Sequence, residues 1–330
     1  YLCTPFIYTD YVAPIPIASK EMDYNGTCLA SGYGRTSHTE KDAISNILLL
    51  AHLELDKRAA CSISQLGDND SFVCINIQGS DVAKGDSGGP LVCKNTGDPN
   101  EKENGVLVGV VSGHIRERGS FFSRVSKYYD FVTDDPALDS FSNIPSYTSL
   151  HSSSPSYSLD TFNSITIYFM LLKCLFCIVL YITECFTLNE TSTNSVNTSE
   201  TNTVTLGPNK DAWVPRVING VPAKSGDVPY QVSLKKQLEG DIYMSFCGGA
   251  IIKEKKVLSA AHCFVENMLS NTSQAGIIYE NLLEDKYAVA GSILSKDKYT
   301  ANNDQAQWRT LERVRYPEEF KFPNYDIAVI

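Results

Sequence analysis

The hexapeptide GDSGGP at residues 85–90 decides how the rest of the chain is interpreted. A serine nucleophile needs a tight, glycine-lined turn, so that its oxygen is exposed and backbone N–H groups point at a developing oxyanion. Gly85 and Ser87 would supply those two N–H groups. A bare GxSxG pattern arises often by chance, whereas the full hexapeptide followed by Leu-Val-Cys at 91–93 is far more specific.

Two further motifs offer partners for such a serine, and both lie far along the chain. The first is LSAAHC at residues 258–263, where small residues and a cysteine flank His262. Imidazole titrates near neutral pH and suits the task of removing the serine proton. The second is NYDIAVI at 324–330, where Asp326 precedes an apolar run and can hold a histidine tautomer. A lone histidine is more often structural and a lone aspartate more often caps a turn, so the hypothesis depends on the motifs together.

These three motifs closely resemble the chymotrypsin/trypsin family of serine proteases. The resemblance implies that Ser87 is the nucleophile, His262 the general base and Asp326 its orienting partner. It implies an oxyanion hole formed by the N–H groups of Gly85 and Ser87. It also implies an all-β fold of two six-stranded antiparallel β-barrels with a short C-terminal helix, here near residues 126–133.

The family resemblance also predicts the primary substrate pocket. The residue six before the nucleophile is Asp81, as in trypsin-like members, where the carboxylate pairs with substrate Arg or Lys. Gly113 and Ser120 would line the walls. The sequence departs from the family pattern because Ala83 stands where a cysteine is expected, and residues 112–125 contain no cysteine to pair with one. We expect cleavage after Arg or Lys by a pocket that lacks its usual disulfide.

The segment RVING at residues 216–220 resembles the zymogen cleavage site of the family. A cut after Arg216 would free the amino group of Val217. In the family that ammonium pairs with the aspartate beside the nucleophile, here Asp86, and so orders the oxyanion hole. Such a buried charge pair works as a switch because either charge alone is costly to bury.

Cysteine content favours an oxidising compartment. The chain has 10 cysteines, and disulfides are frequent in extracellular proteins. Family analogy pairs Cys247 with Cys263, Cys61 with Cys74 and Cys28 with Cys93. Cys174, Cys177 and Cys185 fall in the signal-like segment at 165–186. Cys3 is left over, either as a buried thiol or with a partner outside this chain.

The stretch from Met170, MLLKCLFCIVLYITEC, has the layout of a secretory signal peptide. Its apolar run is too short for a comfortable membrane span, but together with the preceding residues a membrane anchor through 165–183 is the alternative. We therefore expect a secreted protein.

Composition excludes one class of partner. The net charge of -10 and the pI near 5.0 argue against nucleic acid, whose phosphates require a basic face. No metal or organic cofactor is implied by any motif.

The chain divides into five stretches whose composition differs. They are 1–133, the C-terminal barrel with the nucleophile; 134–164, a Ser-rich disordered linker; 165–186, the signal-like segment; 187–216, a disordered propeptide; and 217–330, the N-terminal barrel with histidine and aspartate.

The two halves therefore occur in reverse order relative to the family, and three accounts compete. The chain could be part of a tandem array, with the back of one protease followed by the signal peptide and front of the next. It could be a circular permutant, or a non-catalytic homologue acting as a binding or regulatory module. The internal signal-like segment and a chain end within an expected strand favour the tandem account, since permutation points usually fall in exposed loops. The presence of all three triad residues argues against a non-catalytic role.

The expected function is that of a secreted serine endopeptidase that hydrolyses peptide bonds after Arg or Lys through an acyl-enzyme. Activation would follow cleavage after Arg216. The expected partners are protein or peptide substrates, an activating protease and protein inhibitors.

Overall fold

The computed structural model describes eight stretches of the chain: residues 1–38, 45–55, 69–75, 79–115, 119–134, 218–265, 276–295 and 305–330. All of them belong to one compact unit that comprises Tyr1–Pro136 and Ala212–Ile330. The predicted linker beyond residue 134, the signal-like segment and the propeptide lie outside the described residues. No helix among the described residues is long and apolar enough to cross a membrane.

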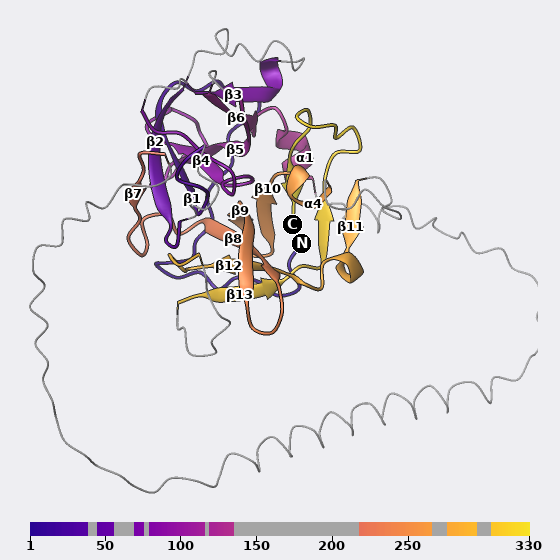
Figure 1. Cartoon of the computed structure of the whole chain (residues 1–330). Helices are drawn as coiled ribbons and strands as arrows, with labels where there is room; N and C mark the ends of the chain where they lie inside the picture. The colour runs from indigo at the N-terminus through magenta and orange to yellow at the C-terminus, as the bar shows by residue number, and fades with distance from the viewer. Residues whose placement is uncertain are drawn as a thin grey trace, which may run out of the picture. The chain divides into compact units, whose positions relative to one another are not determined.

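The first half of the chain, together with the short strand β7 from the second half, forms a seven-stranded antiparallel sheet in the order β3-β6-β5-β4-β1-β2-β7 (Figure 1). Its strands are β1 (Gly26–Gly32), β2 (Leu49–Leu55), β3 (Phe72–Cys74), β4 (Pro90–Cys93), β5 (Val106–Ile115), β6 (Gly119–Arg124) and β7 (Val221–Pro222). A 3-10 turn, η2 (Asn69–Ser71), precedes β3, and the helix α1 (Tyr129–Thr133) follows β6. The short helix predicted near 126–133 is therefore present.

The second half forms an eight-stranded antiparallel sheet in the order β11-β14-β15-β10-β9-β8-β12-β13. Its strands are β8 (Gln231–Gln237), β9 (Tyr243–Lys253), β10 (Lys256–Ser259), β11 (Ile277–Tyr279), β12 (Lys286–Ala290), β13 (Gln307–Thr310), β14 (Arg313–Arg315) and β15 (Ala328–Val329). The one-turn helix α4 (His262–Val265) follows β10, and the 3-10 turn η3 (Glu280–Leu282) follows β11.

The all-β prediction is confirmed, but the strand numbers differ from the predicted six per barrel, and neither sheet closes within the described residues. One extra strand is β7, which pairs with Leu49 and Leu50 at the edge of the first sheet. Proline is tolerated there because an edge strand need not donate on its outer side. Of the two additional strands in the second sheet, one arises because the chain bends at Glu312, where the N–H groups of Glu312 and Arg313 both reach the Tyr1 carbonyl. This bend divides one ribbon into β13 and β14.

The apolar stretch at residues 11–18 is not a regular strand. It contributes single bridges, among them Ile17 opposite Leu107. Pro14 and Pro16 lack the N–H that a sheet ladder requires, so the segment crosses the molecule in an extended form without continuous pairing.

One apolar core joins the two halves. Leu91 and Leu107 from the first sheet and Leu258 and Val329 from the second belong to the same continuous buried cluster. Burial of apolar surface is the main favourable term in folding, so a shared core makes the halves one folding unit. The two sheets depend on each other rather than forming separate domains.

Hydrogen bonds across the junction reinforce the shared core. The Leu48 N–H donates to the Ile293 carbonyl at 2.7 Å. The buried Ser31 hydroxyl donates to Gln231 Oε1 at 2.5 Å. The polar groups of both hydrogen bonds are removed from water. Burying a polar group costs free energy unless the group is paired.

The chain ends lie together inside the second sheet. Ile330 is fully buried and exchanges two backbone hydrogen bonds with Val257, at 2.8 and 2.9 Å. Leu2 is also fully buried, and its N–H donates to the Lys255 carbonyl at 3.1 Å. The N and C labels of Figure 1 are accordingly side by side. The residues at the two ends thus line the same neighbouring strand.

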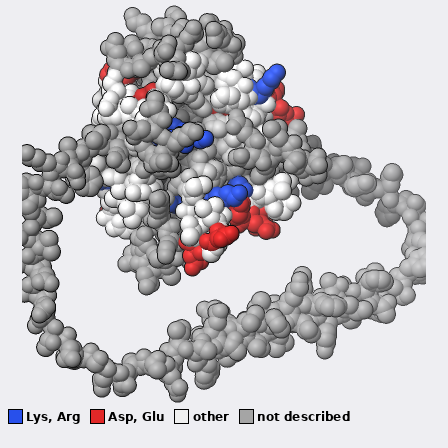
Figure 2. Space-filling view, viewed as in Figure 1, with Lys and Arg blue, Asp and Glu red and all other residues white. Residues whose placement is uncertain are grey.

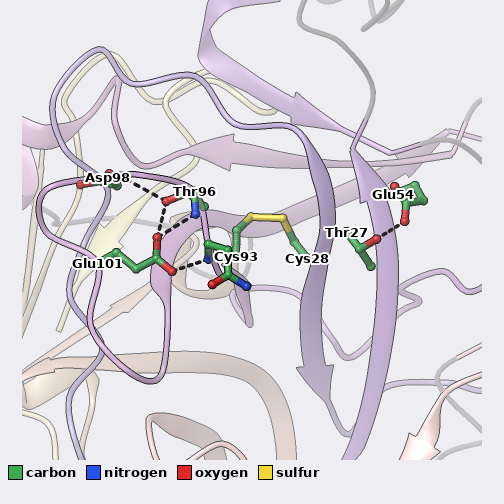
Figure 3. The surroundings of a disulfide bond; sticks show 8 residues. Thr27, Cys28, Glu54, Cys93, Thr96, Asp98 and Glu101 are labelled. Carbon is green, nitrogen blue, oxygen red and sulfur yellow. Dashed lines mark hydrogen bonds between the residues drawn. A yellow bond between two sulfur atoms is a disulfide. The ribbon is translucent and has the colours of Figure 1, made fainter.

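Disulfides fasten each half separately. Cys28 and Cys93 are cross-strand partners on β1 and β4 and are covalently bonded (Figure 3). The loop that follows β4 is held by Glu101, whose carboxylate accepts hydrogen bonds from the Thr96 N–H and hydroxyl at 2.8 and 2.7 Å. In the second half, the disulfide joins Cys247 to Cys263.

The remaining cysteines differ in state. Cys74 is disulfide-bonded, and its predicted partner Cys61 lies outside the described residues. Cys3 is a free thiol and half-buried.

Charged side chains of both signs are interspersed on the surface. On the face shown in Figure 2, lysine and arginine side chains adjoin aspartate and glutamate side chains among the residues drawn in colour. Lys286 and Lys236 both pair with Asp285, at 2.6 and 3.4 Å.

The disulfides give a stability prediction. Replacing Cys28 and Cys93 together by alanine removes a disulfide between residues that are 65 positions apart in the sequence. The same replacement of Cys247 and Cys263 removes one between residues 16 positions apart. Chain-entropy arguments give a loss of about 4 kcal/mol for the first pair and about 3 kcal/mol for the second. Urea denaturation measures both losses, with Cys3→Ala as the control that should change little. A Cys28/Cys93 double variant with the wild-type urea midpoint would contradict the prediction.

Candidate active site

Asp326 is a fully enclosed polar side chain at the junction of the two sheets. It lies two residues before β15 and has 0% exposed surface. Its Oδ1 accepts the His262 N–H at 2.9 Å, and its Oδ2 contacts His262 Nδ1 at 2.7 Å. Ser112 of β5 donates its hydroxyl to the same Oδ2 at 2.5 Å. Donors from both halves of the chain therefore converge on this one carboxylate.

His262 is fixed at both its backbone and its ring. It is the first residue of α4, directly after β10, and its neighbour Cys263 is tied to β9 by the disulfide. The Phe322 ring lies edge-on to the imidazole, with 5.6 Å between ring centroids. Since Nδ1 binds the carboxylate, the neutral ring has the tautomer in which Nε2 can accept a proton.

The GDSGGP turn lies against the strands that lead to His262. The carbonyl of Ser87 accepts the Gly248 N–H at 2.7 Å, and Ser87 itself is half-buried. A Cβ atom on Gly88 would lie only 2.3 Å from Ser259 Oγ, and one on Gly248 only 2.9 Å from the Cα of Gly89. Glycine is needed at both positions because two backbones approach this closely. The structure thus brings the Ser87 turn and the His262–Asp326 pair to the same junction.

The turn also has the backbone conformation that its glycines permit. Gly85 has φ of 104° and Gly88 has φ of 76°, in the left-handed region that side chains disfavour. Gly85 packs against the backbone of Gly34, where an added Cβ would be 2.9 Å from the Gly34 Cα. This conformation orients the backbone around Ser87.

Asp86 is buried behind the turn. Its two carboxylate oxygens accept the N–H groups of Gly34 and Ala83, each at 2.8 Å. Burial raises the pKa of Asp86 to about 6, although these two hydrogen bonds act in the opposite direction. Asp86 makes no ion pair within the described part of the chain. Arg216 and Val217, its predicted activation partners, lie outside that part.

Asp81 lies at the base of the predicted substrate pocket and is almost completely buried. Its Oδ1 accepts the Ser120 hydroxyl at 2.5 Å and the Val82 N–H at 2.8 Å. Its Oδ2 contacts His38 Nε2 at 3.1 Å and His114 Nδ1 at 3.0 Å. Burial alone would raise the pKa of Asp81, but the hydrogen bonds from His114, Ser120 and His38 outweigh it and lower the pKa.

The structure and the sequence expectations differ in which residues surround Asp81. Ser120 contacts it, whereas Gly113 lies against the Phe121 ring, 2.6 Å from where its Cβ would be. The neighbour His114 reaches Asp81, and the predicted place of Gly113 in the pocket wall stays a prediction. Sequence reasoning did not find His114 or His38, because no motif spacing connects either histidine with Asp81.

Two serines of the first sheet were also missed. Ser112 bonds the Asp326 carboxylate, and Ser123 of β6 donates its hydroxyl to the Asp326 carbonyl at 2.6 Å. Both are buried. A buried serine among apolar strand residues requires a hydrogen-bond partner. The serine within an apolar run was the only feature of the sequence that could have indicated either contact.

Similarity to known proteins agrees with this geometry. A family model described as Trypsin matches residues 2–132 and 217–330. Renal glandular kallikrein of Mastomys natalensis is 35% identical over 111 residues, which cover 33% of this chain and 38% of the relative. Transmembrane protease serine 9 of Rattus norvegicus is 28% identical over 288 residues, 80% of this chain and 24% of the relative.

A solved structure, neuropsin, a serine protease expressed in mouse brain, is 24% identical and covers 37% of this chain and 52% of its own, with a TM-score of 0.31. The chain thus spans well under two thirds of the length of these relatives. Because the Trypsin family model covers most of the chain, in two segments that together contain the serine, histidine and aspartate motifs, the chain belongs to the trypsin family.

Proposed function

We propose that the chain is a serine endopeptidase in which Ser87, His262 and Asp326 form one catalytic triad. The observation that carries the proposal is the double contact of the buried Asp326 with the His262 backbone and ring. A carboxylate that holds both atoms fixes the imidazole in position as well as in tautomer. The Ser87 turn is bonded to the strand next to the histidine.

The reaction then follows from these groups. Nε2 of His262 removes the Ser87 proton as Oγ attacks the scissile carbonyl, and the new imidazolium is stabilised by Asp326. The N–H groups of Gly85 and Ser87 stabilise the oxyanion. His262 returns the proton to the leaving amine, which leaves an acyl-enzyme on Ser87. Water, activated by the same histidine, releases the acid and restores the serine.

Substrates with Arg or Lys before the cleaved bond fit the charge of Asp81. A buried carboxylate favours a cationic side chain, and a guanidinium can bond it with two N–H groups. His38 and His114 already contact Oδ2, so an incoming cation has to displace them. We expect the Arg or Lys preference to be retained with weaker substrate binding than an unoccupied carboxylate would give.

Activation by another protease fits the state of Asp86. Its raised pKa reflects a buried carboxyl without a cation among the described residues. Cleavage after Arg216 would provide the Val217 ammonium as that cation. The two described disulfides each lie within one half, so the cut would leave the halves joined by the shared core. Secretion, an activating protease and protein inhibitors complete the proposal.

One comparison favours a second arrangement of the two halves. The match to Transmembrane protease serine 9 covers 80% of this chain, more than the two matched family segments together. It therefore runs through both halves in the order found here, as a tandem array would. In that assembly Ser87 and His262 have the same roles but serve neighbouring active sites.

Labelling of the nucleophile tests the proposed chemistry. A fluorophosphonate probe should label the chain after cleavage at Arg216, and Ser87→Ala should abolish labelling and lower kcat/KM for an arginine ester by at least about 10³-fold. Ser225→Ala removes an exposed serine and serves as the matched control that keeps both signals. Absence of labelling in the folded, cleaved wild type would instead indicate a non-catalytic homologue.

The pH dependence of stability tests the Asp86 switch in the uncut chain. The folded pKa of about 6 is above the ordinary value of 3.8, so the folded state binds this proton more tightly than the unfolded state. Its stabilising contribution is fully present below pH 3.8 and is lost as the pH rises through 6, a loss on the order of 3 kcal/mol.

The measurement compares urea denaturation of the wild type and Asp86→Asn from pH 4 to 8. The difference between the two free energies of unfolding should change in favour of the asparagine variant as the pH rises. After cleavage the variant should lack activity, because the new ammonium has no carboxylate to bind. A pH-independent difference in the uncut chain would contradict the assignment.

A further inference from the structure

We propose that His38, Asp81 and His114 form a binding site for a divalent transition-metal ion such as Zn²⁺. The ligand atoms are His38 Nε2, Asp81 Oδ2 and His114 Nδ1, which all lie within 4.8 Å of one another. This departs from the expectation that no metal is involved. The site lies at the base of the predicted substrate pocket and not at Ser87 or His262.

The distances between the donor atoms suit a tetrahedral ion. Asp81 Oδ2 is 3.1 Å from His38 Nε2 and 3.0 Å from His114 Nδ1. Ligand atoms bound to Zn²⁺ at about 2.0–2.1 Å in a tetrahedron are about 3.3–3.4 Å apart. These two distances are therefore close to those expected around a bound ion.

The chemistry of the donor set also suits such an ion. Two imidazoles and one carboxylate are the protein ligands of many open zinc sites, where the fourth position is taken by water or substrate. Asp81 is buried, and within the described residues its ion-pair partners are these two histidines rather than a lysine or arginine. A dication bound at Oδ2 would balance the charge of this buried carboxylate.

The supporting structure holds Asp81 and leaves His38 adjustable, whereas His114 Nδ1 also contacts the Ser120 hydroxyl at 3.2 Å. Ser120 and Val82 bond the other carboxylate oxygen, Oδ1, and so orient Oδ2 towards the histidines. The side chains of His38 and His114 remain 35% and 24% exposed, which gives an ion access from solvent. Ordered partners around a ligand raise metal affinity.

One rearrangement is required. The two imidazoles are stacked, with 3.8 Å between their centroids and 23° between their planes. A nitrogen lone pair lies in the plane of its ring, so two nearly parallel rings cannot both point at one ion. The more exposed ring, His38, must rotate and open the stack on binding.

A second cluster that contains a histidine cannot bind an ion in this way. Cys247, His262 and Cys263 also lie close together, but the two cysteines are joined in a disulfide and have no thiolate to offer. The pocket cluster is thus the stronger of the two.

The consequence for activity rests on the proposed function. An ion on Asp81 occupies the carboxylate that would bind the substrate Arg or Lys. Zn²⁺ should therefore raise KM for an arginine substrate and leave kcat unchanged, as a competitive inhibitor does. The same ion should weaken binding of benzamidine, a cationic probe of the pocket.

Metal binding is tested directly on the full chain by calorimetric titration with Zn²⁺ and by the visible spectrum of bound Co²⁺. We expect one ion per chain at this site and a loss of affinity of at least about tenfold in His38→Ala and in His114→Ala. His52→Ala, which removes an exposed histidine on β2, is the matched control. His262→Ala should also bind normally, which separates this site from the catalytic histidine.

A measurement on the wild type keeps the test independent of how the variants fold. In NMR spectra, Zn²⁺ should shift the imidazole proton signals of His38 and His114 and leave those of His52 in place. Unchanged histidine signals, or wild-type affinity in both pocket variants, would overturn the proposal. Zn²⁺ binding in a chain that no serine probe labels would retain the metal site and refute the protease function. Serine labelling without Zn²⁺ binding would retain the protease function and refute the metal site.

Discussion

The carboxylate of Asp326 has no exposed surface, and the arrangement of both sheets around it follows from that constraint. A buried carboxylate is tolerated only when its oxygens are bonded, and removing one partner of such a group costs several kcal/mol, about 3–5. Here the partners are His262 from the same half and Ser112 from the other. The Ser123 hydroxyl from the first sheet bonds the Asp326 carbonyl. The aspartate is therefore satisfied only when the two halves are closed on each other.

The serine turn is joined to this centre through a short series of contacts. Ser87 accepts a hydrogen bond from Gly248, whose neighbour Cys247 is bonded to Cys263, next to His262. Close backbone approach at Gly248 makes the contact possible. Movement of β9 would thus displace serine and histidine together. The proposed nucleophile, Ser87, and the proposed base, His262, are positioned by one strand.

Features of the fold and the site that local chemistry decides could be predicted from the sequence. Features that depend on packing between distant residues could not. The sequence predicts Ser87, His262 and Asp326 as one catalytic set because a nucleophile, a base and its partner demand particular residue types in particular turns. The all-β fold and the short helix α1 followed from the family resemblance. The strand counts did not, since the bend at Glu312 depends on contacts with Tyr1.

The surroundings of Asp81 show most clearly what could not be predicted from the sequence. The carboxylate itself was placed by its spacing from Ser87. His38 reaches it from the connection after β1 and His114 from β5, and neither position has a distinguishing sequence pattern. Only the folded arrangement brings the two imidazoles to one oxygen. It thereby changes an expected cation-binding carboxylate into one already in contact with two histidines.

The central claim is that Ser87 and His262 of the same chain share one active site. Complementation tests it directly: Ser87→Ala and His262→Ala chains are mixed, cleaved after Arg216 and treated at once with a fluorophosphonate probe. The account predicts strong labelling of the wild type and none of either variant or of the mixture, since neither chain has a complete site. Labelling that reappears in the mixture would show that serine and histidine meet between chains, and would contradict the account.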